Sequence, residues 1–275
     1  MTEHNFNGQA FRLRYPAVMG ILNVTPDSFS DGGLHLEVAK AVDRVRQMLE
    51  EGAQFIDVGG ESSRPGSEPV SVDEELRRIL PVIEALPSEE CVISIDTTKP
   101  DVAQAALEAG AHVVNDVSGG TDSTLFDLAE RHQAGYVLMH AQGSPKTMQD
   151  APAYDDVVSE VLAFFDEQAK CLAERNLPKV WMDPGIGFGK TLEHNLALMH
   201  NLGDLRDDRW GILLGASRKS WIDKLCGAPD SEHRLGGSLA AAIEAARQGA
   251  EIIRAHDVRE TVQALEVMEQ LLEVV

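Results

Sequence analysis

Cysteine is scarce in the sequence, and the three cysteines lie far apart. They stand at positions 91, 171 and 226 of a 275-residue chain and form no Cys-x-x-Cys pair. The nine histidines show neither His-x-x-x-His nor His-Glu-x-x-His spacing. A disulfide framework and a zinc site are therefore disfavoured, and free thiols in a reducing cytoplasm are expected.

Long apolar runs are missing as well. No stretch reaches the roughly 18 apolar residues that a membrane-spanning helix needs. Residues 1–14 lack the apolar segment of a secretory signal. We therefore expect a cytoplasmic protein that has no membrane partner.

Positive charge is in short supply. The chain carries 24 Lys and Arg against 45 Asp and Glu, which gives a formal net charge of -21. Such a field repels nucleic acid and anionic lipid, so small molecules are the expected partners. An anionic substrate would require a local cluster of basic side chains to overcome this background.

Short apolar runs, by contrast, recur along the whole chain. Eight of them are continuous rather than alternating, as is typical of parallel strands that are covered on both faces. Segments with helical spacing separate them. The runs cover residues 17–22, 55–58, 92–95, 112–114, 136–139, 180–182, 212–214 and 252–253.

A repeated joint between helix and strand supports a repeated βα unit. Gly52, Gly110 and Gly249 each stand between a helical segment and a strand, where glycine can end a helix in the left-handed conformation. Pro100 suits the first position of a helix. We predict one α/β domain over residues 1–275, a (β/α)8 TIM barrel of eight parallel strands. An open, doubly wound sheet is the alternative.

Polar or ionisable side chains end every predicted strand. One such residue is explained as a turn or cap residue, but the strands of a barrel bring all eight sets to one rim, where barrel enzymes have their active sites. Asp57 and Asp116 can instead brace loops, Ser217 can shape a turn, and His140 can be a hydrogen-bonded rim histidine. The strand-end residues are Asn23, Asp57, Glu61, Asp96, Asn115, Asp116, His140, Asp183, Ser217, Lys219, Arg254 and His256.

A glycine-rich segment at residues 183–191 invites comparison with nucleotide-binding loops. Gly189-Lys190-Thr191 resembles the end of a Walker A motif, but Pro184 stands where that motif needs glycine. The segment also differs from a Gly-x-Gly-x-x-Gly dinucleotide fingerprint. A nucleotide site is therefore disfavoured.

Several segments resemble the motifs of the dihydropteroate synthase family of pterin-binding barrels. The longest are residues 20–33, 57–66 and 183–190, and they lie in the order typical of the family. Ser63 stands where the family usually has threonine, which keeps the hydroxyl. Shorter matches lie at residues 95–97, 115–117, 139–140, 148–149, 217–219 and 254–257.

The resemblance implies a reaction of folate biosynthesis. An enzyme of this family joins 6-hydroxymethyl-7,8-dihydropterin pyrophosphate to 4-aminobenzoate and releases 7,8-dihydropteroate and pyrophosphate. It further implies a homodimer, and Mg²⁺ held by the Asn23 side-chain oxygen, pyrophosphate oxygens and water. The residues that the resemblance assigns to catalysis are Asn23, Asp31, Arg64, Lys219, Arg254 and His256.

The residue types suit this chemistry. Buried carboxylates such as Asp96 and Asp183 can accept paired hydrogen bonds from the donor edge of a pterin, and Asn115 can both donate and accept. Expulsion of pyrophosphate needs cationic donors, and the electron-rich ring favours a dissociative path. The residues expected to bind the pterin substrate are Ser62, Ser63, Asp96, Asn115, Met139, Asp183, Lys219, Arg254 and His256. Those expected to bind 4-aminobenzoate are Phe29, Pro65, Phe188, Lys219 and Ser220.

Three other functions stay open on the sequence. A non-catalytic pterin-binding paralogue would share the barrel and much of its rim. A pterin-dependent methyltransferase would share the pterin aspartates without needing Arg64 or residues 217–219. A generic phosphate-sugar barrel enzyme would leave the paired carboxylates unexplained.

Overall fold

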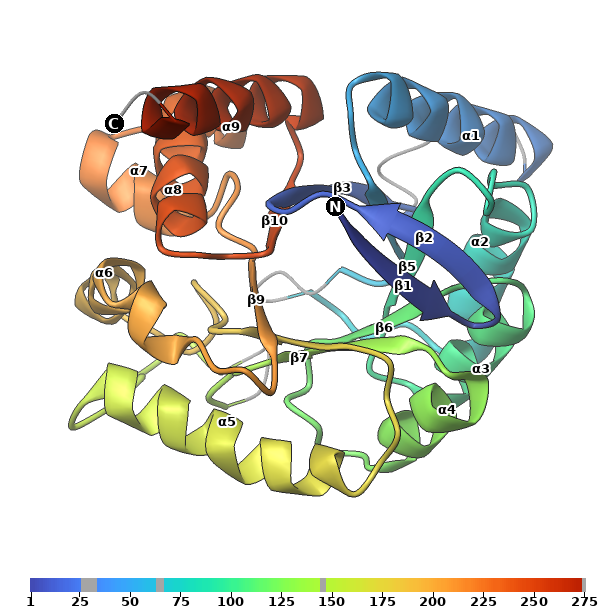
Figure 1. Cartoon of the computed structure of the whole chain (residues 1–275), viewed down its shortest axis with the longest axis horizontal. Coiled ribbons are helices and arrows are strands. Elements are labelled where there is room, and N and C mark those ends of the chain that lie inside the picture. Colours follow the sequence, from blue (N-terminus) through green and yellow to red (C-terminus); the bar gives the residue numbers. More distant parts are fainter. Residues whose placement is uncertain (26–33, 63–66, 144–146, 274–275) are drawn as a thin grey trace.

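Eight parallel strands close into a barrel in the computed structural model, which describes residues 1–25, 34–62, 67–143 and 147–273. The strand order is β10-β3-β4-β5-β6-β7-β8-β9, and β9 pairs back onto β10 (Figure 1). The predicted barrel is therefore confirmed, and the open doubly wound sheet is wrong. The strands are β3 (Ala17–Asn23), β4 (Phe55–Gly59), β5 (Val92–Asp96), β6 (Val113–Asp116), β7 (Gly135–Met139), β8 (Val180–Asp183), β9 (Gly211–Leu214) and β10 (Ile252–Ala255).

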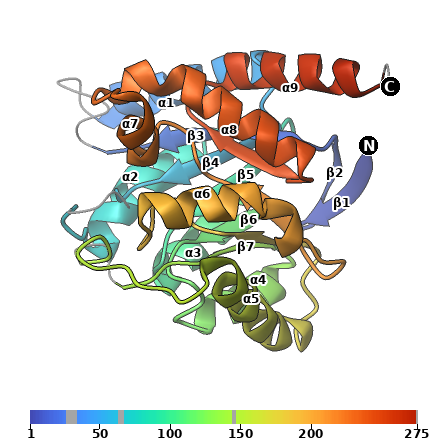
Figure 2. The ribbon, with the colours of Figure 1, turned by 90° about the vertical axis from the view of Figure 1, so that its left-hand side faces the viewer.

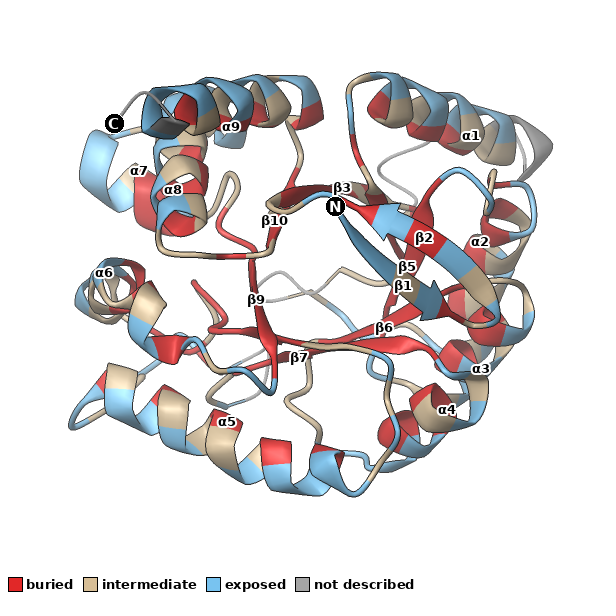
Figure 3. Ribbon diagram, in the orientation of Figure 1, coloured by how far each residue is buried: buried red, intermediate tan, exposed pale blue. Residues whose placement is uncertain are grey.

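Helices surround the barrel as an outer ring, and their exposed sides face outward (Figure 3). The predicted joints are confirmed, because Gly52, Gly110 and Gly249 have φ angles of 101°, 108° and 92°, which favour glycine. Pro100 begins its helix as expected. The helices are α1 (Leu34–Glu50), α2 (Val72–Ile83), α3 (Pro100–Glu108), α4 (Thr124–His132), α5 (Val157–Ala173), α6 (Leu192–His200), η2 (Leu202–Leu205), α7 (Ser220–Cys226), η3 (Ser231–Arg234), α8 (Leu235–Arg247) and α9 (Val258–Glu273).

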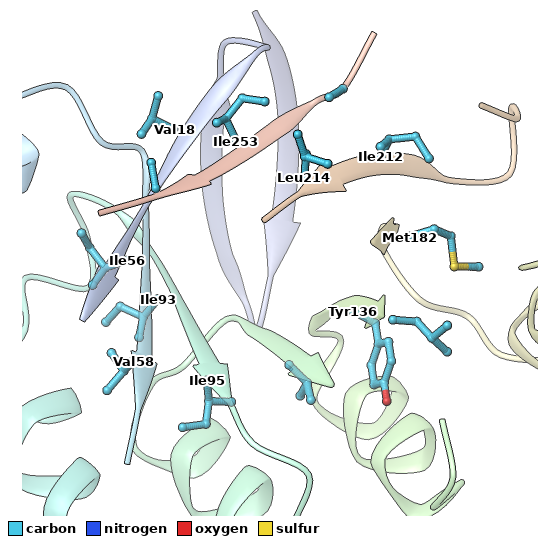
Figure 4. Packing of buried hydrophobic residues seen from close by; sticks show 14 of the residues in the cluster. Val18, Ile56, Val58, Ile93, Ile95, Tyr136, Met182, Ile212, Leu214 and Ile253 are labelled. Carbon is cyan, nitrogen blue, oxygen red and sulfur yellow. The ribbon is translucent and has the colours of Figure 1, made fainter. Parts of the chain in front are cut away.

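The strand residues divide into two sets by the two-residue period of a β-strand. Val18, Ile56, Ile93, Met182 and Ile253 belong to the larger core cluster, which joins the outer face of the barrel to the helices (Figure 4). The residue that precedes each of them along its strand belongs to a second cluster inside the barrel. The inner cluster includes Ala17, Met19, Phe55, Val92, Val113, Val137, Trp181, Leu213 and Ile252.

A β-hairpin that the sequence analysis missed covers one end of the barrel (Figures 1 and 2). It consists of antiparallel strands β1 (Thr2–Phe6) and β2 (Gln9–Leu13), joined at Asn7 and Gly8 with φ angles of 49° and 79°. Phe6, Phe11 and Leu13 pack on the inner cluster, most of whose members begin their strands. The hairpin therefore seals the amino-terminal end and leaves the carboxyl ends of the strands for a site.

Among the described residues, no helix is long and apolar enough to cross a membrane.

Candidate active site

The inner face of the barrel changes from apolar to polar toward the carboxyl ends of its strands. Asp96 lies four residues after Val92, and Arg254 lies two residues after Ile252, so each projects to the same side as an inner-cluster residue. The same period places Asp183 inside the barrel two residues after Trp181. The sequence-predicted strand-end residues therefore converge because the strands alternate.

Arg254 joins two acidic side chains across the inside of the barrel. Its Nε lies 2.6 Å from Asp57 Oδ2, and its Nη2 lies 2.8 Å from Asp96 Oδ2. Asn115 Nδ2 donates to the same Asp57 oxygen at 3.0 Å. Four strands, β4, β5, β6 and β10, contribute one residue each to this network. Asp57, which the sequence allowed to be a loop brace, lies instead within the barrel interior.

Lys219 and Asp183 approach each other beside a residue that has no side chain. A Cβ atom placed on Gly215 would lie 3.3 Å from Asp183 Oδ2 and 3.9 Å from both Lys219 Nζ and Arg254 Cδ. Lys219 Nζ donates to the Ile186 carbonyl at 2.6 Å. Glycine at position 215 therefore keeps open the space that these three charged side chains surround.

The aromatic ring of Phe188 is the second support of Lys219. The ammonium lies 4.6 Å from the ring centroid, a distance suited to a cation–π contact. Two of the side chains predicted to bind one acceptor molecule are therefore in contact with each other.

Burial shifts the pKa of each of these groups in the direction that favours its neutral form. It raises the pKa of Asp96 to about 7, against the opposing charge of Arg254, while the charge of Asp57 adds to the increase. Burial also raises the pKa of Asp183, although Lys219 opposes that shift. The pKa of Lys219 falls to about 8 by burial. Strongly shifted titratable groups that share one cleft are typical of functional sites.

The glycine-rich segment after β8 is fixed against the end of β7. Gly185 and Gly189 have φ angles of 66° and 61°, and added Cβ atoms would lie 1.9 Å from His140 O and 2.2 Å from Gln142 O. Only glycine permits both the backbone angle and the close approach. Asp183 supports the turn, because its Oδ1 accepts a hydrogen bond of 2.7 Å from the Gly185 amide.

Lys190, whose motif invited the nucleotide comparison, is buried and structural. Its ammonium lies 2.9 Å from His140 Nδ1, 3.0 Å from the Phe188 carbonyl and 3.3 Å from the His140 carbonyl. Burial lowers the pKa of Lys190 to about 7 and that of His140 to about 3. His140 is therefore the hydrogen-bonded rim histidine that the sequence allowed, and Lys190 braces the segment that carries Phe188.

The segment before α7 holds its shape through a strained arginine. Arg218 has a φ angle of 57°, which is unusual for a residue with a side chain. Its guanidinium pairs with Asp257, and its amide donates to Ser238 Oγ at 2.9 Å. Ser217 Oγ lies 3.1 Å from His256 Nδ1, so Ser217 does more than shape a turn.

The remaining predicted residues fall into three groups. Asn23 ends β3 and is half-buried, Met139 ends β7 in a buried position, and Asp116 braces the loop after β6 by accepting from the amides of Ser118 and Gly120 at 2.8 Å each. Ser62 follows β4, and Ser220 is the exposed first residue of α7. The predicted residues that lie outside the described part of the chain are Phe29, Asp31, Ser63, Arg64 and Pro65.

A partly buried polar network around Glu61 includes residues that the sequence analysis did not select. Lys99 pairs with both Glu61 and Glu75, and Thr97 Oγ1 donates to Glu75 Oε1 at 2.8 Å. Glu75 is fully buried on helix α2. The sequence analysis selected residues at the ends of predicted strands, so it did not select Glu75. The network ties the segment after β4 to the segment after β5.

Comparisons with known proteins show the family to which the chain is similar. A model of the family described as pterin binding enzyme matches residues 19–256. A dihydropteroate synthase from Escherichia coli is 49% identical over 268 residues, which cover 96% of this chain and 95% of that protein. One from Synechocystis is 44% identical over 258 residues, 92% of this chain and 89% of that protein.

Solved structures share the fold over the whole length. A Yersinia pestis dihydropteroate synthase in a sulfonamide drug complex has a TM-score of 0.90 at 42% identity and covers 99% of this chain and 100% of its own. A Xanthomonas albilineans dihydropteroate synthase in complex with 7,8-dihydropteroate has a TM-score of 0.87 at 40% identity and covers 100% of both chains.

Proposed function

The chain belongs to the dihydropteroate synthase family and is a transferase, and on this premise we propose how its barrel mouth performs the family reaction. The chain condenses 6-hydroxymethyl-7,8-dihydropterin pyrophosphate with 4-aminobenzoate to give 7,8-dihydropteroate and pyrophosphate. The observation that carries the proposal is the convergence of Asp96, Asp183, Lys219 and Arg254 at the carboxyl ends of four different strands or their loops.

We assign the recognition of the pterin to the buried acidic residues. A pterin presents ring N–H and exocyclic amine donors along one edge, and Asp96 and Asp183 can accept from them. Lys219, which lies beside Asp183, donates to the ring carbonyl and ring nitrogen. Met139 is buried at the end of the intervening strand β7 and packs against the ring face.

The pyrophosphate leaves toward the basic side of the mouth. Arg254 lies near the end of β10, His256 directly follows that strand, and both supply donors to the developing charge. Ser62, Ser63 and Arg64 follow β4 in the sequence and complete this set by family resemblance, together with Asp31, which follows β3 in the sequence. We propose a dissociative path, which predicts a normal α-secondary isotope effect when the pterin methylene carries deuterium.

The donor set at the mouth fits Mg²⁺ better than a metal held by protein alone. No group of three His, Cys, Asp or Glu side chains suited to a metal occurs in the described part of the chain. Asn23 ends β3 at the same mouth, and Mg²⁺ commonly uses one or two protein oxygens together with phosphate oxygens and water. Bound there, the ion would neutralise charge on the departing pyrophosphate.

Removal of the metal is therefore expected to stop turnover. EDTA should abolish release of pyrophosphate, and added Mg²⁺ should restore it, because the leaving group would otherwise depart as an uncompensated anion. A hydroxymethylpterin without pyrophosphate should bind equally well with and without Mg²⁺ by calorimetry. Full turnover in metal-free buffer would contradict the assignment of Asn23 as a metal ligand.

We propose that 4-aminobenzoate binds where Phe188 and Lys219 meet, next to Ser220. Phe29 and Pro65, the other expected contacts, follow β3 and β4 in the sequence. Because this pocket is proposed to lie beside the pterin, a sulfonamide should compete with 4-aminobenzoate and not with the pterin substrate. Calorimetry should show that pterin with pyrophosphate and Mg²⁺ tightens sulfonamide binding by about 5–150-fold. The variant F188A should weaken sulfonamide binding more than pterin binding, because Lys219 keeps its hydrogen bond to the Ile186 carbonyl. Equal binding of the sulfonamide to the free protein would refute the order of assembly.

Pterin affinity should have an optimum between about pH 7 and pH 8. The ionised Asp96 carboxylate accepts from the ligand, and a group with a pKa of about 7 loses most of its charge below that pH. The dissociation constant should therefore rise about tenfold from pH 8 to pH 6. Above pH 8 the loss of the Lys219 charge should weaken binding again. In the pH profile of pterin affinity, the variant D96N should lose the fall toward acidic pH, and K219M should lose the fall toward alkaline pH. A pH-independent affinity in the unmodified protein would refute both roles.

Three broader assignments complete the proposal. We propose a homodimer, supported by the exposed apolar side chains Val267, Leu271 and Leu272 near the end of α9, which light scattering would test. Free cysteines suit a reducing, cytoplasmic location. Residues 1–275 form one domain in this proposal, and limited proteolysis that released a stable fragment would contradict it.

An assay of the purified chain tests the function itself. Dihydropterin pyrophosphate, 4-aminobenzoate and Mg²⁺ should yield 7,8-dihydropteroate and pyrophosphate in equal amounts. Pterin binding without product would identify a non-catalytic paralogue. Methyl transfer to a corrinoid protein without pteroate formation would identify a methyltransferase.

A further inference from the structure

We propose that Asp57 is a positioning residue that sets the orientation of Asn115 and Arg254 for pterin recognition. The inference rests on the proposed function, because it assumes that Asn115 and Arg254 contact the pterin substrate. Asp57 itself lies in the middle of β4, two residues before the strand ends. Asp57 therefore lies deeper in the barrel than the proposed ligand site and acts through the side chains of Asn115 and Arg254.

The position of Asp57 is unusual for a carboxylate. The side chain is fully buried, and one oxygen, Oδ2, receives Arg254 Nε at 2.6 Å and Asn115 Nδ2 at 3.0 Å. Strands β10 and β6 each lie two places from β4 in the barrel order. The hydrogen bonds therefore cross the inside of the barrel between strands that are not neighbours. They orient the side chains of Asn115 and Arg254 and play no part in strand pairing.

The chemistry of Asp57 decides which way the Asn115 amide faces. A carboxylate only accepts hydrogen bonds, so Asn115 must turn its Nδ2 toward Asp57 and its Oδ1 away. Asn115 then offers an acceptor to a ligand, where the sequence had allowed a donor and an acceptor equally. A pterin donor is accepted by that oxygen. An amide released from Asp57 could rotate and meet the donor with another donor.

The same oxygen fixes the plane of the Arg254 guanidinium. Its Nε is held by Asp57 and its Nη2 by Asp96, so two bonds in one plane define the orientation of the group. Without Asp57 one of these bonds is lost and the guanidinium can turn about the other. Asp57 thus links the pterin-reading amide to the cation assigned to the leaving group.

Ser94 supplies a matched control within the same layer of the barrel. It is the register partner of Asp57 on the neighbouring strand β5 and is equally buried. Its hydroxyl makes no hydrogen bond to any described residue. A substitution at Ser94 therefore disturbs the same region without removing a hydrogen bond from Asn115 or Arg254.

A double-mutant cycle on the full-length protein tests the proposal. Calorimetry with 6-hydroxymethylpterin would compare D57A, N115A and the double variant D57A/N115A. Each single variant should weaken binding by about tenfold. The double variant should lose little more than N115A alone, because this ligand lacks the pyrophosphate assigned to Arg254 and Asp57 then acts through Asn115. The dissociation constant of S94A for 6-hydroxymethylpterin should lie within about twofold of that of the unmodified protein. In the double variant S94A/N115A the two fold-changes should multiply, as for independent sites.

The conservative variant D57N separates positioning from general damage. The amide oxygen of an asparagine at position 57 can accept from Arg254 and Asn115 as Oδ2 does, so D57N should recover pterin affinity to within about threefold. If D57A fails to fold, D57S in the same cycle draws the acceptor back from Asn115 and Arg254, because the serine side chain is shorter, and leaves a smaller cavity. Unchanged affinity in D57A, independent losses in the cycle, or no recovery in D57N would overturn the proposal. Normal affinity in N115A would instead refute the pterin site itself.

Discussion

Replacing Arg254 with methionine is expected to lower the free energy of unfolding by about 3–5 kcal/mol. The substitution leaves the carboxylates of Asp57 and Asp96 inside the barrel without the cation that both contact. Burying an uncompensated charge costs far more than losing an exposed pair. Urea unfolding at about pH 8 would measure the difference.

Arg209 offers the matched control for this prediction. It also binds two carboxylates, Asp166 and Asp207, but about half of its side chain is exposed, so R209M should cost about 1 kcal/mol or less. The defect of R254M should shrink toward pH 5.5. Burial already raises the pKa of Asp96 to about 7, and a protonated Asp96 no longer needs the arginine. A small, pH-independent defect would show that Arg254 does not neutralise the buried acids.

The sequence could predict which residues meet because the barrel repeats one simple rule. Each strand alternates its side chains, and all eight carboxyl ends share one rim, so Asp96, Asp183 and Arg254 were placed without coordinates. The sequence did not predict which of these side chains form ion pairs and hydrogen bonds with one another. The Arg254 contacts to Asp57 and Asp96 depend on how far β10 stands from β4 and β5 once the barrel has closed, and nothing local in the chain fixes that distance.

The amino-terminal hairpin was missed for a different reason. Asn7-Gly8 is a strong turn signal, but the strands of the hairpin pair only with each other. The first strand is polar apart from Phe6, and Gln9 and Arg12 interrupt the apolar residues of the second. A search for continuous apolar runs passes over such strands. The contacts by which Lys190 braces its segment could not be predicted, because they depend on the approach of His140, which follows β7.

Replacing Asp183 with alanine is expected to raise the dissociation constant of the pterin substrate about a hundredfold or more. Each ligand donor left without a partner in a buried site costs about 1–3 kcal/mol, and the pterin edge brings at least two such donors to the carboxylate. Asp183 is 5% exposed at the end of β8, so water cannot readily replace it. Calorimetry with the pterin substrate and Mg²⁺ would measure the loss.

Asparagine at position 183 separates ligand recognition from support of the loop. Asp183 Oδ1 accepts from the Gly185 amide, and an asparagine can keep that bond while turning its Nδ2 toward the ligand. D183N should therefore bind pterin almost as poorly as D183A, since a donor would then face the pterin donors. D116N is the control, because Asp116 braces backbone amides in the same way after β6 and should affect stability without weakening pterin binding. Normal pterin affinity in D183N would show that Asp183 only holds the turn at Gly185, and would remove it from the site.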